Sequence, residues 1–86
     1  MPTASPPPAA PQRQLLAEFE RRYAGWWTAQ AAAEAAERAF ILRARQHELG
    51  AGEPPAPDDL RRMLDLHAAA TRLQQDALQI LRDAPL

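Results

Sequence analysis

The sequence predicts an all-α fold, a two-helix antiparallel hairpin of the coiled-coil type. Alanine, the strongest helix former, occurs 20 times in 86 residues, while valine is absent and other β-branched residues are few. Apolar residues recur at intervals of three and four over two long stretches. One break rich in proline and glycine, residues 50–57, separates the two stretches. A single domain with no β-sheet follows from these observations.

The chain divides into a tail and a hairpin. Residues 1–11 contain five prolines with Ala, Ser and Thr, which predicts a disordered tail. Residues 12–86 form the hairpin, with helices over 12–49 and 58–83 and a loop over 50–57. Gly50 is placed to end the first helix in the left-handed conformation. Asp58 and Asp59 fall in the first turn of the second helix, where the helix dipole favours anionic side chains.

In the first helix the large apolar residues fall on one broad arc, and residues 29–39 are mostly alanine. Small side chains there would let a neighbouring helix approach closely. Glu18–Arg22 and Glu34–Arg38 are expected to form ion pairs along the helix, because residues four apart are neighbours on its surface.

The second helix carries two parallel apolar lines. The first line consists of Met63, Leu66, Ala70, Leu73, Ala77 and Ile80. The second line follows the same spacing and consists of Leu60, Leu64, His67, Thr71, Gln74, Leu78 and Leu81. Together they cover roughly 200° of the helix surface, whereas one packed neighbour needs only about 100°. One antiparallel neighbour therefore leaves part of this surface uncovered.

The two helices also differ in length. If Leu49 faces Asp58, opposed residue numbers add up to about 107, and nothing in the second helix reaches Leu15, Leu16 or Phe19. A two-helix hairpin has little core of its own. Both points predict a second chain that completes a four-helix bundle, either by homodimerisation or by binding a different protein.

The predicted protein interface combines the aromatic cluster of the first helix with the first apolar line of the second. Tryptophan and tyrosine dominate binding hot spots, although the same cluster could serve as ordinary hairpin core. The interface residues are Leu15, Leu16, Phe19, Tyr23, Trp26, Trp27, Met63, Leu66, Leu73 and Ile80.

Polar residues interrupt the apolar arcs at Glu37, His67, Thr71 and Gln74. They are expected to form a polar layer that fixes the register, with a Glu–His pair or a metal site as the alternative. Two histidines and one glutamate without paired histidine spacing do not make a ligand set. No nucleophile, phosphate loop or cofactor motif is present. We therefore expect no catalytic residue, no metal, no cofactor and no small-molecule substrate, and we expect that the protein is not an enzyme.

Charge and composition restrict the partners further. The net charge is −1, and no basic tract is present to neutralise a phosphate backbone, so protein is the expected partner. The competing interpretation is a nucleic-acid-binding or regulatory hairpin that uses Arg38, Arg43, Arg45, Arg61 and Arg62. The absence of a signal sequence and of a membrane-spanning run leads us to expect a cytoplasmic protein without membrane contact. The Arg, Ala and Pro bias suggests a bacterial source.

The layout resembles small two-helix bacterial proteins. The run from Pro54 to Leu60, followed by a helix, is similar in outline to type III secretion needle subunits and their hairpin co-chaperones. Rop-like RNA-binding hairpins share the outline, but their working face is basic, and this chain has no evident equivalent. The likeness is one of outline and assigns no family. The expected function is a non-enzymatic protein–protein interaction module, such as a small adaptor, a chaperone-like protein or an assembly subunit.

Overall fold

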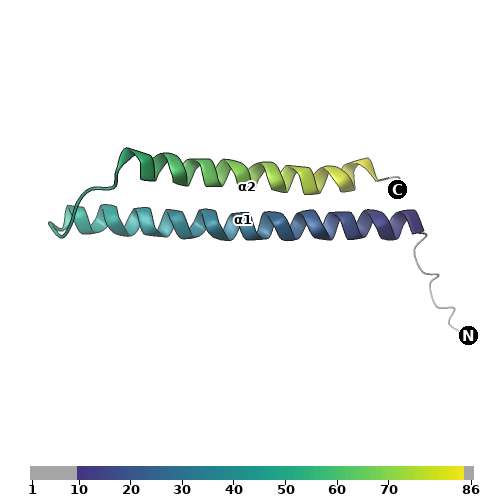
Figure 1. The fold of residues 1–86 in the computed structure, drawn as a ribbon, viewed down its shortest axis with the longest axis horizontal. Coiled ribbons are helices and arrows are strands. Elements are labelled where there is room, and N and C mark those ends of the chain that lie inside the picture. The colour runs from purple at the N-terminus through teal and green to yellow at the C-terminus, as the bar shows by residue number, and fades with distance from the viewer. Residues whose placement is uncertain (1–9, 85–86) are drawn as a thin grey trace, which may run out of the picture.

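The computed structural model describes residues 10–84, which form two helices packed side by side in opposite directions (Figure 1). Helix α1 spans Ala10–Glu48 and helix α2 spans Pro57–Asp83. The predicted all-helical hairpin is therefore confirmed, and both helices begin and end within two residues of the predicted bounds. The predicted disordered tail lies outside the described residues, except for Ala10 and Pro11, which belong to α1.

The end of α1 is a glycine-terminated turn of the Schellman type. Gly50 has a φ of 77°, as the sequence predicts. The amide of Gly50 donates to the carbonyl of His47 at 2.9 Å, and the amide of Ala51 donates to that of Gln46 at 2.8 Å. These two bonds satisfy carbonyl groups that the last helical turn would otherwise leave unpaired. His47 Nδ1 also donates to the carbonyl of Gly52 at 3.1 Å, which ties the loop back to the helix.

The start of α2 is fixed by its own first turn. Pro57 is the first helical residue, where the missing amide hydrogen is not needed. The Asp59 carboxylate accepts a hydrogen bond from the amide of Ala56 at 3.0 Å and one from the Arg43 guanidinium at 2.9 Å. Asp59 thus caps α2 and also links it to α1.

The register differs from the predicted one by about one turn. The contacting pairs are Arg43 with Asp59 at 2.9 Å and Glu37 with His67 at 3.7 Å, so opposed residue numbers add up to 102 and 104 rather than 107. The last turn of α1 projects beyond the start of α2, and the loop runs back alongside it (Figure 1). As a result α2 lies further toward the N-terminus of α1, where Leu15 and Phe19 are half-buried.

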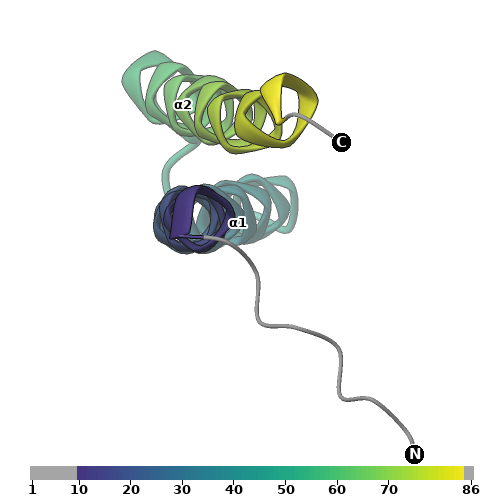
Figure 2. The same ribbon diagram turned by 90° about the vertical axis from the view of Figure 1, so that its right-hand side faces the viewer.

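The contact between the helices is built on alanine. Ala33, Ala70 and Ala77 are fully buried, and no large side chain among residues 10–84 is. Seen end-on, the two helices cross at a shallow angle (Figure 2). Small residues in the seam let the backbones come close, and the large apolar side chains are displaced to its edges. This arrangement decides what the two outer sides of the hairpin expose.

Candidate protein interface

Four aromatic side chains form a continuous row on α1. The ring centroids of Phe19 and Tyr23 are 5.6 Å apart, those of Tyr23 and Trp26 are 5.0 Å apart, and those of Trp26 and Trp27 are 5.8 Å apart. Trp26 is half-buried in the seam, whereas Trp27 is 63% exposed. Consecutive residues of a helix point about 100° apart, so the two indoles cannot share one neighbour. The row therefore belongs partly to the hairpin contact and partly to its surface.

Two interhelix contacts mark the two open sides of the hairpin. Glu37 meets His67 on one side, and Arg43 meets Asp59 on the other. Residues seven positions apart lie on the same side of a packed helix. The sequence separation between any other residue and one of these four therefore shows on which side of the hairpin that residue lies.

The side marked by Glu37 and His67 carries most of the exposed apolar surface. On α1, Tyr23 and Leu16 precede Glu37 by multiples of seven residues and so lie on its side, and Trp27 and Ile41 lie next to them. On α2, the second apolar line contains His67 and so lies on the same side. Eight large side chains here are between 38% and 63% exposed. We call them the apolar side; they are Leu16, Tyr23, Trp27, Ile41, Leu60, Leu64, Leu78 and Leu81.

The side marked by Arg43 and Asp59 is a shallow groove. It has a volume of about 500 Å³. Its floor and walls consist of Ala32, Ala35, Ala36, Ala39, Phe40, Arg43, Asp59, Arg62 and Leu66. We call it the alanine groove. The ion pair between Arg43 and Asp59 lies at its end nearer the loop, and Leu73, further along α2, is 38% exposed.

The polar pair in the middle of the apolar side is incomplete. His67 Nε2 lies 3.7 Å from Glu37 Oε1, too far for a hydrogen bond. This nitrogen is itself buried and has no hydrogen-bond partner. The predicted register had separated Glu37 from His67 by about one turn, and the observed register brings them together. Among residues 10–84 no group of three potential metal ligands occurs.

The structure divides the predicted interface residues into two sets. Leu16, Tyr23, Trp27 and Leu73 are exposed. The others are half-buried, namely Leu15, Phe19, Trp26, Met63, Leu66 and Ile80. The expectation that Leu15 and Phe19 are bare in the single chain is wrong, because the shifted register brings the end of α2 to the level of Phe19. Participation of all ten in an interface stays a prediction.

Within residues 10–84, seven exposed large apolar residues are not among the ten predicted interface residues; besides Leu42 and Leu49, five of them lie on the apolar side. These five are Ile41, Leu60, Leu64, Leu78 and Leu81, and four of them belong to the second apolar line of α2. The signal was present, because that line has leucines at both ends. Choosing between the two lines required the register, which decides that Ala70 and Ala77 of the first line enter the seam.

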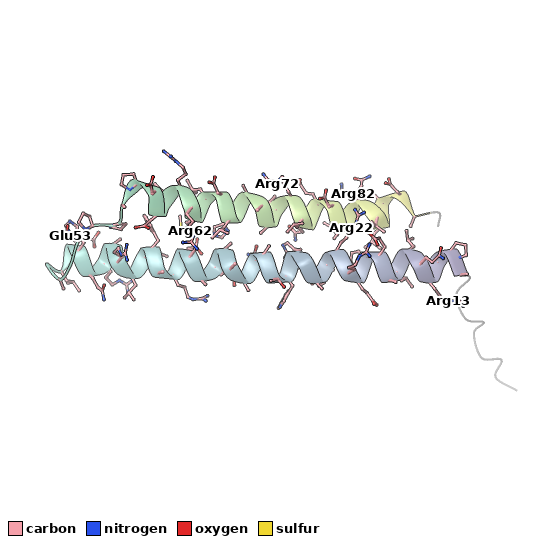
Figure 3. All side chains as sticks on the ribbon, viewed as in Figure 1. Arg13, Arg22, Glu53, Arg62, Arg72 and Arg82 are labelled. Carbon is pink, nitrogen blue, oxygen red and sulfur yellow. The ribbon has the colours of Figure 1, made fainter. Side chains whose placement is uncertain are left out.

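The arginines do not gather into one basic face. Arg43 is engaged with Asp59, and Arg62 lies at the edge of the alanine groove. Arg72 and Arg82 project from the outer side of α2, whereas Arg22 and Arg62 lie along the line where the helices meet (Figure 3). Arg22 and Arg21 both pair with Glu18. A phosphate backbone would therefore meet cations that are separated and partly neutralised.

Comparisons with protein-family models, with curated proteins and with solved structures return no match for this chain. Within residues 10–84 neither helix combines the length and the apolar character that crossing a membrane requires. The surface of the hairpin itself is therefore the basis for a functional proposal.

Proposed function

We propose that this chain is a non-enzymatic protein–protein interaction module, a small adaptor, chaperone-like protein or assembly subunit that binds other helices through its apolar side. The main support for the proposal is that small side chains are buried between the helices while large apolar side chains are exposed, the reverse of an ordinary protein core. The seam buries alanines, while eight large apolar residues face outward on one side. Soluble monomers rarely expose a contiguous apolar patch of this extent without a partner for it.

The shape of the apolar side suits a helical partner. The two helices run side by side along the length of α2 (Figure 1), and each contributes a row of exposed apolar side chains to this side. An amphipathic helix laid along this side would contact both rows at once. Trp27 and Tyr23 supply the aromatic anchors that commonly dominate binding energy. Helices added on this side would complete the four-helix bundle, and we place this role in the cytoplasm.

The polar groups of the described helices support the non-enzymatic part of the proposal. The Thr28 hydroxyl donates to the carbonyl of Ala24 at 3.2 Å, and the Thr71 hydroxyl donates to that of His67 at 3.0 Å. Both hydroxyls thus donate to main-chain carbonyls of their own helices and not to a side chain that could act as a base.

A site-specific photo-crosslinker tests the proposed function. Trp27→p-benzoylphenylalanine places the reactive group on the apolar side, and Thr28→p-benzoylphenylalanine, one residue on, places it about 100° away. We expect protein adducts in the host cell from position 27 and few from position 28, measured by gel mobility and mass spectrometry. Equal labelling from the two positions, or none from position 27, would contradict the proposed function.

A further inference from the structure

We propose that the partner on the apolar side is a second copy of this chain, packed face to face with its loop at the opposite end. This inference rests on the proposed function and names its partner. It follows from a symmetry in the spacing and chemistry of the side chains on this side, which a two-fold axis between two copies would use.

The second apolar line of α2 reads alike from both ends. Its order is two leucines, then His67, Thr71 and Gln74, then two leucines. Leu60 with Leu81 and His67 with Gln74 each add up to 141, and Leu64 with Leu78 adds up to 142. Suppose that a second α2 packs antiparallel to the first, with the two helices centred on residue 71. Each leucine of this line would then face a leucine of the other copy, and each polar residue would face a polar residue.

The middle of α1 has two symmetric pairs on this side. Ile41 with Trp27 adds up to 68, and Glu37 with Gln30 adds up to 67, so the centre lies at Glu34. The interhelix contacts place Glu34 at the level of residues 68–70, within about one turn of the centre of α2. Two centres found independently thus lie at one level of the hairpin, as a single two-fold axis requires.

The same axis supplies a partner for the incomplete polar pair. It brings Gln74 of the second copy to the His67 side chain, which is 33% exposed. It also brings Gln30 of the second copy to Glu37. A glutamine side chain both donates and accepts, so it can serve an imidazole nitrogen in either tautomer and can donate to a carboxylate. Each copy would then contribute four polar side chains to the interface.

The overhang of α1 selects the orientation. The start of α1 extends past the end of α2 (Figure 1), and Leu16, near that start, has 47% of its surface exposed. If both loops lay at the same end, Leu16 of each copy would stay uncovered. With the loops at opposite ends, the axis brings Leu16 to the level of residues 51–52 of the second copy, next to Leu49, which is 78% exposed.

The surface offered is large enough for a stable dimer. A standard specific interface takes about 800 Å² from each partner. Eight large side chains that are each roughly half exposed, two of them aromatic, offer an area of that order. The alanine groove offers mainly small side chains and a charged end, so it cannot supply comparable apolar contact.

Two matched double variants test which side associates. Leu64→Gln with Leu78→Gln changes leucines that are 55% and 38% exposed on the apolar side. Leu42→Gln with Leu73→Gln changes leucines that are 57% and 38% exposed elsewhere. We expect light scattering on the full chain to give twice 9.5 kDa for the unmodified protein and the control. The first variant should raise the dissociation constant a hundredfold or more while circular dichroism shows the helices retained.

The relative orientation of the two copies is tested by the distance between two spin labels, one on each loop. The chain has no cysteine, so Ala51→Cys gives one spin-label site in the exposed loop. Loops at opposite ends predict a label separation of about 50 Å at 1.5 Å per residue. Loops at the same end would give about 10–20 Å, set by the width of the bundle. The short distance would overturn the proposed orientation.

The outcomes separate this inference from the proposed function. A monomeric mass for the unmodified chain at all concentrations, with protein adducts still forming at position 27, would overturn self-association and leave the interaction module intact. Loss of the dimer in the control variant alone would place the interface away from the apolar side and overturn the proposal. Absence of both dimer and adducts would contradict both proposals.

Discussion

Gly25 and Gly50 show how differently one residue type acts within the same helix. Gly50 has a φ of 77°, which an L side chain adopts at a cost of roughly 1–2 kcal/mol. Gly25 lies inside α1, and a Cβ added there would meet nothing within 4 Å. We therefore expect Gly50→Ala to lower the free energy of unfolding by about 1 kcal/mol and Gly25→Ala to raise it by about 0.5–1 kcal/mol.

Urea unfolding followed by circular dichroism measures both changes. The two variants are each other's controls, because the substitution is identical and only the backbone conformation differs. A loss of stability in Gly25→Ala would mean that close contact with another chain, and not helix propensity, governs that position.

At the residue scale the sequence predicts those features that depend on neighbours along the chain. The left-handed Gly50 and the Glu18–Arg22 ion pair, at 2.8 Å, are both confirmed. The Glu34–Arg38 pair does not form among the described residues, and Glu34 accepts from Gln30 at 3.2 Å instead. An exposed ion pair contributes so little free energy that a hydrogen bond from another residue of the same helix can replace it.

At the scale of the helices, the seam depends on side chains no larger than a methyl group. Ala70→Leu would place three further carbon atoms where the exposed fraction is now zero. We expect it to lower the free energy of unfolding by about 1–3 kcal/mol, because the helices must separate to accept it. Ala31→Leu, at an exposed position of α1, is the matched control and should change stability by less than about 0.5 kcal/mol.

Chemical denaturation of the two leucine variants at equal protein concentration gives the comparison. If Ala70→Leu were as stable as the control, the seam would have room for a larger side chain, contrary to the complete burial of Ala33 and Ala70.

Helix bounds were predictable, whereas the register was not. The alanine content, Pro57 and Gly50 determine where the helices begin and end, and all three are local signals. The register depends on the path of the loop, which the bond from His47 to Gly52 draws back along α1. Because periodicity does not describe that path, the predicted register was wrong by about a turn, and Leu66 and Ile80 were favoured over the more exposed Leu64 and Leu78.

At the scale of the whole molecule, stability and association are expected to be coupled. The proposed dimer would add apolar burial to a hairpin whose fully buried side chains, among residues 10–84, are all alanines, so dissociation should leave it marginal. We expect the melting temperature to rise by about 5–10 °C over a hundredfold increase in protein concentration. Thermal unfolding followed by circular dichroism at 222 nm, a wavelength standard for helices, measures it.

The variant Leu64→Gln with Leu78→Gln provides the reference for this experiment. Its melting temperature should be low and independent of concentration, because a monomer unfolds without dissociating. A constant melting temperature in the unmodified chain would instead indicate that each hairpin is stable alone.

The two adjacent tryptophans give the molecule an optical reporter of its own. Trp26 is half-buried against α2, and Trp27 is open to solvent, so a dissolved quencher reaches the second indole before the first. Tyr23, with its ring centroid 5.0 Å from that of Trp26, passes its excitation on to the indoles. Anything that covers Trp27 therefore shifts the emission toward the blue, and occupancy of this surface can be read from the fluorescence of the unlabelled chain.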